Sequence, residues 1–145
     1  KIATFPAVPS TALKKELYAE IGYCRKTVNL LALTDTDEVN LLVTVAANGD
    51  ATIVENAAAV AALTTEELAV VVDTAIYDDP NVTSTPAARA DTAVVFRGPS
   101  AVSVDELLLG DASKGKALSG ANKTILVDLF EAQGIKNLDS MQPAV

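Results

Sequence analysis

The stretch that decides the fold is Asp91-Thr-Ala-Val-Val-Phe-Arg-Gly98, at the start of the last third of the chain. In it, Thr92, Val94 and Phe96 alternate with the residues between them, and this period of two is typical of a strand with one face more buried than the other. Pro99 follows, and proline has no amide hydrogen to donate to a sheet. We therefore predict a strand that ends just before this proline.

A short helix is predicted next, because Ser103 and Glu106 have the spacing of a capping box. In this motif the hydroxyl accepts a hydrogen bond from the amide three residues on, and the carboxylate accepts one from the amide of the serine. The helix should start there and end near Gly110. Asp105 and Glu106 would then place negative charge at the positive end of the helix.

A second, longer helix is predicted from Lys123 onward. Its apolar residues recur at helical spacing on one face, while its charged residues lie mostly elsewhere. The apolar positions are Ile125, Leu126, Leu129 and Phe130. Gly134 is a natural left-handed terminator, and Ile135 beyond it can fold back on Phe130. We expect this helix to cover one side of the sheet.

The clearest signal in the first half of the chain is Asn48-Gly49-Asp50, since Asn-Gly readily adopts the positive φ values of tight hairpins. It separates predicted strands at residues 39–47 and 51–55, which should pair in antiparallel fashion. Residues 23–33 indicate an earlier strand, and residues 34–38 a polar turn.

Two segments of the first half suggest helices. Residues 11–20 are compatible with one or two turns of helix capped by Ser10 or Thr11. Residues 57–63 are rich in alanine and fit either a helix or a buried strand. Local composition therefore leaves the second segment open.

Residues 64–89 are predicted to form a short connection, a strand and a loop. Thr64 and Glu67 resemble a second capping box, which indicates a short helical connection. An apolar strand is predicted at residues 68–77. Residues 78–89 are a loop by composition.

Length and composition indicate a single core rich in β structure. At 145 residues the chain fits one core better than two ordinary domains. Half of its residues are apolar, aromatic residues are scarce, and β-branched residues supply much of the apolar mass, which favours sheets. No apolar run approaches the ~20 residues that a bilayer crossing needs, and no signal segment is evident after Lys1.

The order of these elements resembles the lambda-type head decoration proteins of tailed bacteriophages. The resemblance is carried by Ala69-Val-Val-Val-Asp, by the strand that ends in Arg97-Gly98, by Leu107-Leu-Leu-Gly110, and by the helix end Leu129-Phe-Glu-Ala-Gln-Gly-Ile135. It covers residues 69–135, about half of the chain. Residues 111–121 look like an inserted loop, and residues 136–145 like an extension past the usual end.

The resemblance implies a mainly β (α+β) fold: a small β-barrel or β-tulip-like body with short peripheral helices and an extended N-terminal arm. Residues 1–10 would form the arm and residues 11–145 a single decoration-protein domain. Pro6 and Pro9 favour extended backbone, and an extended arm can add a strand to another sheet. By position in the family, capsid binding is assigned to Lys1, Ile2, Ala3, Thr4 and Phe5. The alternative is an arm that packs on its own subunit.

Patterns for catalysis and metal binding are weak. The chain has no histidine, which removes the commonest general base and makes a Ser-His-Asp or Cys-His arrangement impossible. Asp35, Asp37 and Glu38 resemble part of a calcium loop, but Asn40 and Ala46 stand where the loop needs a glycine and a bidentate acid. We expect neither a metal nor a cofactor.

Three further features argue against other activities. Cys24 is the only cysteine, so no disulfide can form within the chain, and a buried apolar role is the simpler interpretation. Ser113-Lys-Gly-Lys116 lacks the spacing of a phosphate-binding loop. The net charge of −8 disfavours binding to nucleic acid.

The sequence thus predicts a structural subunit and not an enzyme. The resemblance implies a capsid decoration, or cement, protein on the outer surface of the virion, made in the host cytoplasm and trimeric at three-fold and quasi-three-fold positions. Its partners would be the major capsid protein and two further copies of itself, without contact to nucleic acid or membrane. Another virion subunit, from the tail tube or the head–tail joint, is the alternative. An enzyme that uses carboxylates alone is a third hypothesis.

Overall fold

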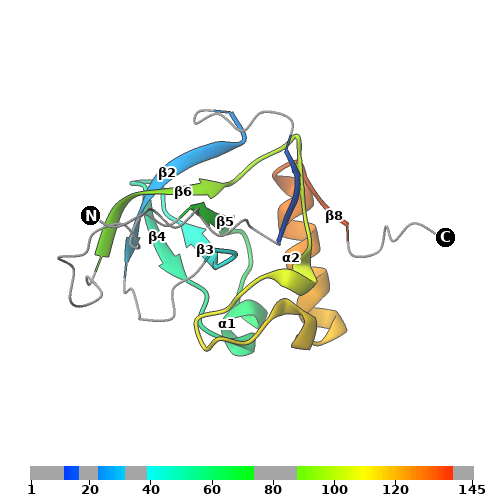
Figure 1. Ribbon diagram of the computed structural model, residues 1–145. Coiled ribbons are helices and arrows are strands. Elements are labelled where there is room, and N and C mark those ends of the chain that lie inside the picture. The colour runs from blue at the N-terminus through cyan, green and yellow to red at the C-terminus, as the bar shows by residue number, and fades with distance from the viewer. Residues whose placement is uncertain (1–11, 17–22, 32–38, 74–87, 139–145) are drawn as a thin grey trace, which may run out of the picture.

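Five strands close into a barrel in the computed structural model, which describes residues 12–16, 23–31, 39–73 and 88–138 (Figure 1). Around the barrel the order is β2 (Arg25–Leu31), β4 (Asp50–Ile53), β3 (Leu42–Val45), β5 (Glu67–Asp73) and β6 (Ala88–Val95), which pairs with β2. β2 and β4 are parallel, and the other neighbours are antiparallel. The predicted mainly β fold with a small barrel and short helices is confirmed.

A second sheet of three strands lies beside the barrel. It contains β1 (Leu13–Glu16), β7 (Ser100–Val102) and β8 (Ile135–Asn137), with β7 in the middle. β1 is antiparallel to β7, and β8 is parallel to it. The two outer strands therefore each have one described neighbour.

Both outer strands correct a prediction. The helix predicted at residues 11–20 is wrong over Leu13–Glu16, because this segment pairs with β7 and the Ala12 carbonyl accepts a hydrogen bond from the Ser103 amide at 2.7 Å. A local helix preference of a few residues is weak compared with such pairing. The chain after Ile135 is likewise no simple extension, since Ile135–Asn137 completes the sheet.

Two α-helices pack against this framework, and each has a side-chain N-cap. In α1 (Ala57–Ala61) the Asn56 side chain accepts from the Ala59 amide at 2.9 Å. In α2 (Gly120–Ala132) the Ser119 hydroxyl accepts from the Asn122 amide at 3.2 Å. The ambiguous segment at residues 57–63 is thus helical at its start, and the longer predicted helix is confirmed with an earlier beginning.

The two predicted capping boxes are wrong. Ser103 precedes a single 3-10 turn (Val104–Glu106), and its side chain makes no capping hydrogen bond. Glu67 belongs to β5, while the carboxylate of Glu66 accepts from the amides of Thr64 and Thr65. At Thr64 the start of β5 at Glu67 leaves too few residues for a helix. After Ser103 the turn stops at Glu106, because Leu107 has extended backbone and Leu108 forms a bridge to Leu41. The expected inserted loop at residues 111–121 contains a second 3-10 turn (Gly115–Ala117) and the first residues of α2.

Two predicted chain reversals are confirmed. β3 and β4 form an antiparallel hairpin, and Gly49 at its tip has a φ of +90°, which a side chain would strain. α2 ends at Ala132, Gly134 just beyond it has a φ of +81°, and Ile135 is buried in the same cluster as Phe130.

The apolar residues form two cores that share the wall made by β3 and β5. The barrel core comprises Val28, Leu30, Leu41, Val43, Val45, Ala51, Ile53, Ala69, Val71 and Val94. The interlayer core lies between the barrel wall, the helices and the three-stranded sheet; its members include Leu42, Leu68, Val70, Val102, Leu126, Phe130 and Ile135. Successive residues of a strand point to opposite faces, so this wall is apolar on both sides.

Several predictions concern residues that the structure does not describe. These are the arm at residues 1–10, the acidic group of Asp35, Asp37 and Glu38, most of the loop predicted at residues 78–89, and residues 139–145. The last two residues of that predicted loop, Ala88 and Arg89, instead begin β6, because they pair with β2. None of the helices in the described ranges combines the length and the hydropathy that a bilayer crossing requires.

Candidate interaction surface

The outer face of the three-stranded sheet carries a hollow of about 380 Å³, which we call the sheet hollow. Residues of all three strands and of the adjoining turns line it: Lys15, Pro99, Ser100, Ala101, Gly134, Lys136 and Leu138. Most of this lining is aliphatic, and the Ser100 hydroxyl is directed to the Arg97 carbonyl at 2.9 Å. The sheet hollow is therefore suited to an apolar group and not to a network of polar ligand contacts.

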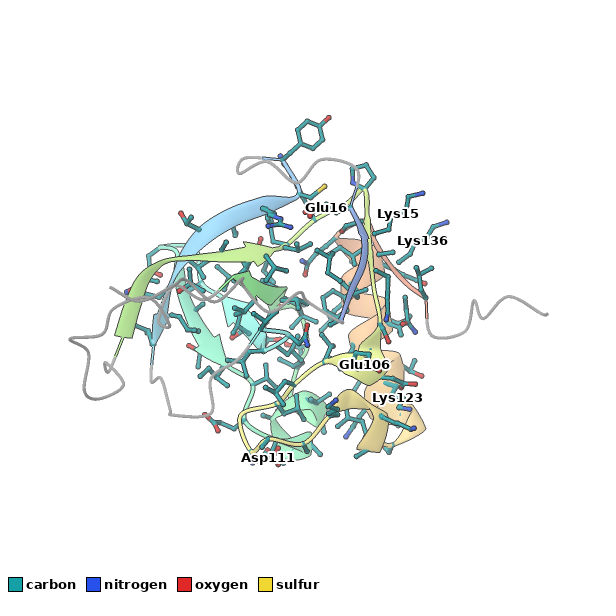
Figure 2. The ribbon with its side chains drawn as sticks, viewed as in Figure 1. Lys15, Glu16, Glu106, Asp111, Lys123 and Lys136 are labelled. Carbon is teal, nitrogen blue, oxygen red and sulfur yellow. The ribbon has the colours of Figure 1, made fainter. Side chains whose placement is uncertain are left out.

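Two lysines flank the sheet hollow, Lys15 on β1 and Lys136 on β8. Both are exposed, and Figure 2 shows them on the same side of the molecule with their side chains pointing away from its body. Neither makes an ion pair or a side-chain hydrogen bond to any residue within the described ranges. Their charges remain available to an external anion.

Arg25 and Lys123, by contrast, are committed to structural pairs. Arg25 binds Glu16 through its Nε at 2.9 and 3.0 Å, and only 6% of the Glu16 side chain is exposed. This bidentate pair joins β1 to the barrel strand β2. Lys123 meets Asp105 at 2.9 Å, which ties α2 to the 3-10 turn before it. The acidic pair predicted to sit at a helix start is thus partly neutralised by the next helix.

The floor of the sheet hollow depends on a close approach between two glycines. The Gly98 amide donates to the Gln133 carbonyl at 3.1 Å, which brings the turn before β7 against the turn after α2. A Cβ atom on Gly98 would collide with the carbonyl oxygen of Gly134. Because the opposing atom is backbone, no side-chain rotation can relieve such a collision.

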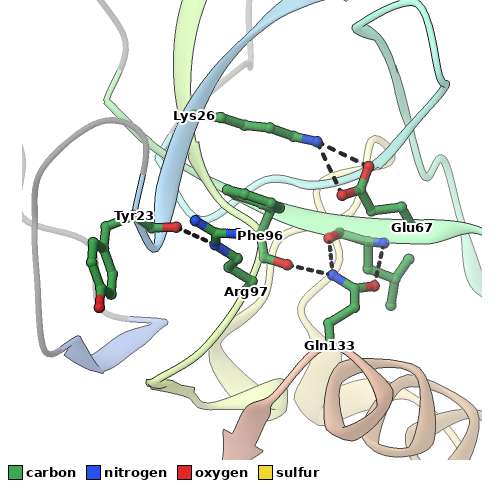
Figure 3. A network of polar contacts seen from close by, with 7 residues as sticks. Tyr23, Lys26, Glu67, Phe96, Arg97 and Gln133 are labelled. Atoms are coloured by element: carbon green, nitrogen blue, oxygen red, sulfur yellow. Dashed lines mark hydrogen bonds and ion pairs between the residues drawn. The ribbon is translucent and has the colours of Figure 1, made fainter.

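Gln133 holds the barrel and α2 together at this point (Figure 3). Its Nε2 donates to the carbonyls of Leu68 and Phe96 at 2.7 and 2.6 Å, and its Oε1 accepts from the Leu68 amide at 2.8 Å. The side chain thus satisfies backbone groups at the ends of β5 and β6, as a further strand would. It fixes the position of Gly134, which lines the sheet hollow.

A cationic cluster surrounds Phe96 beside this junction (Figure 3). The Lys26 Nζ lies 4.3 Å from the ring centroid and binds Glu67 at 3.0 Å. The Arg97 guanidinium lies 5.1 Å from the centroid, and its Nε donates to the Tyr23 carbonyl at 2.5 Å. These contacts join β2, β5 and β6, so the cluster has a structural explanation.

Two acidic side chains have pKa values below their ordinary range because of local hydrogen bonds. The Ser113 hydroxyl and then its amide lower the pKa of Asp111. The Thr64 amide, followed by the amide of Glu66 itself, lowers the pKa of Glu66. Both carboxyl groups are exposed and shape turns, and neither faces the sheet hollow.

The arrangement offers binding surfaces more than reactive groups. Cys24 is buried, as predicted, and its Sγ donates to the Pro99 carbonyl at 3.4 Å. In the described part of the chain no three carboxylate or thiol side chains gather as metal ligands would. In the segment Ser113-Lys-Gly-Lys116, the Gly115 amide donates to the Leu107 carbonyl at 2.8 Å.

Sequence reasoning and structure select different surfaces. The predicted capsid-binding residues, Lys1, Ile2, Ala3, Thr4 and Phe5, lie outside the described residues. Lys15 and Lys136 were missed, because one stood in a predicted helix and the other in a presumed extension. No local sequence pattern predicts that β1, β7 and β8 pair in one sheet.

Comparison of the chain with protein-family models, curated proteins and solved structures finds no significant match.

Proposed function

We propose that this protein is a capsid decoration, or cement, protein that binds the outer surface of a tailed-phage head as a trimer and reinforces the shell. The proposal rests on the sequence resemblance over residues 69–135 and on the surface just described. Its location on the virion is part of the same proposal.

The observation that carries the proposal is the place of β1. This strand lies at the edge of the three-stranded sheet, and its described hydrogen-bonding neighbour is β7 on one side. The predicted arm, residues 1–10, precedes it along the chain. A partner captured by the arm would therefore lie close to a sheet edge with backbone donors and acceptors to offer.

A rigid body next to a binding arm suits the mechanical task of cementing a shell. The body has two cores that share the wall of β3 and β5, so force on one layer is carried to the other. In a trimer three arms would bind neighbouring capsid subunits at once. Weak contacts then act together, because the second and third binding steps take place at high effective concentration.

Deletion of residues 1–10 tests the role of the arm. We expect the truncated protein to keep its oligomeric state and melting temperature but to lose binding to empty expanded heads, as measured by co-sedimentation. Deletion of residues 139–145, a terminal segment of similar length, is the matched control and should bind normally. Unchanged binding without the arm would refute the arm as the attachment site.

Particle microscopy tests the function itself. A decoration protein should cover the shell at its three-fold and quasi-three-fold positions. A single ring of subunits at one vertex or along the tail would instead identify a joining or tail-tube protein.

A further inference from the structure

We propose that the sheet hollow is a second docking site, for a segment of the shell protein that presents an apolar side chain beside one or more carboxylates. This inference rests on the proposed function and adds to it the surface and the chemistry of the partner. It concerns the folded body, whereas the arm is a separate attachment.

The lining determines the apolar part of the partner. Pro99, Ala101 and Leu138 present aliphatic surface, and the stems of Lys15 and Lys136 extend it on both sides. Lysine stems pack along apolar groups while their ammonium groups stay in water. One aliphatic side chain of the partner can enter this space, and it would be covered by the two stems.

The two ammonium groups determine the charged part of the partner. Lys15 and Lys136 come from opposite edges of the sheet and have no anionic partner among the described residues, although the chain carries 19 acidic and 11 basic side chains. In so acidic a chain, two uncommitted cations beside an apolar hollow complement a carboxylate-bearing segment. Two cations are too few for a phosphate backbone, whose binding draws on many.

The sheet hollow lies within reach of the partner that the arm is proposed to bind, which is the shell protein. Lys15 lies on β1, ten residues after Phe5 of the predicted arm. An extended chain of that length reaches at most about 35 Å, so the site where the arm binds its partner lies within that distance of Lys15.

The test compares Lys15→Glu/Lys136→Glu with Lys14→Glu/Lys116→Glu in the full-length protein. The control pair consists of exposed lysines that do not line the sheet hollow and brings the same change in net charge. Lys116 precedes α2 and the sheet hollow lies beyond the other end of this helix, whose 13 residues span about 20 Å, so Lys116 is remote from the sheet hollow. Lys15→Arg/Lys136→Arg keeps both charges and should behave as the wild type.

Binding to expanded heads assembled from the shell protein of the same phage is measured by co-sedimentation, with sedimentation velocity and melting temperature recorded for each variant. We expect the Lys15/Lys136 reversal to weaken binding at least ~10-fold, since repulsion replaces attraction at each subunit, and the control reversal to change it less than about 3-fold. Oligomeric state and melting temperature should stay unchanged.

Four outcomes would overturn the inference. Equal losses in both reversed pairs would show a general charge effect. A change of oligomeric state only in the Lys15/Lys136 pair would make the sheet hollow a contact between copies of this chain. If all variants bind as the wild type does, the sheet hollow is not a docking site, and the proposed function still stands. If the wild type itself binds no heads, both the docking site and the proposed function are refuted.

Discussion

At the scale of single residues, the side chain of Gln133 joins parts of the chain that are far apart in sequence. One side chain satisfies the amide and carbonyl of Leu68 and the carbonyl of Phe96, residues 65 and 37 positions away. It forms part of the predicted helix end, but its contacts could not be inferred, because no local pattern encodes partners so distant. Gly49 and Gly134 were predictable, since positive φ is a local requirement.

Replacement of Gln133 by leucine should destabilise the protein by about 2–4 kcal/mol, because three partly buried backbone groups lose their partner. Urea denaturation measures the change. Gln133→Glu keeps the acceptor for the Leu68 amide but sets a carboxylate oxygen against the carbonyl oxygens of Leu68 and Phe96, so a loss at least as large as that of leucine is expected. If leucine costs no more than a few tenths of a kcal/mol, water already substitutes for this side chain.

At the scale of elements, long periodic segments were predictable and short edge strands were not. Apolar alternation predicts β6, an apolar stripe at helical spacing predicts α2, and the Asn-Gly pair predicts the β3–β4 hairpin. β1 has four residues and β8 three, too few to show a period. Their conformation is imposed by pairing with β7.

The N-cap of α2 gives a prediction at this scale. Ser119→Ala removes the hydroxyl that accepts from Asn122, and a lost cap destabilises by about 1 kcal/mol. Because α2 carries Leu126 and Phe130 into the interlayer core, we expect the loss to appear in global unfolding by urea. Thr124→Ala is the control, since its hydroxyl bonds only the Gly120 carbonyl on the exposed face. A smaller effect for Ser119→Ala than for the control would contradict the role of the cap.

At the scale of the whole molecule, the shared wall should make the two cores unfold together. Phe130 is fully buried in the interlayer core, while Val28 and Leu30 on the far strand β2 belong to the barrel core. Phe130→Ala should cost about 3–5 kcal/mol of unfolding free energy. The slowest-exchanging amides of β2 should lose a similar free energy in hydrogen exchange, because they open through the same global transition.

The hydrogen-exchange experiment on Phe130→Ala can also contradict the idea that the two cores unfold together. If β2 keeps its protection while α2 loses it, the barrel is an independent unit and the three-stranded sheet is an appended layer. Val28→Ala, placed in the other core, is the reciprocal variant and should then leave the α2 amides unaffected.

The sequence by itself determined the class of fold, the strand at residues 92–96, the hairpin and the long helix. It also determined the apolar run of β5, because a wall buried on both faces needs continuous apolar residues. Only the tertiary structure decided that β1 and β8 are strands, that the second sheet exists, and that Lys15 and Lys136 flank one hollow. The physical reason is distance along the chain: these strands take their hydrogen bonds from β7, more than 30 or 80 residues away, and local signals carry no information about such partners.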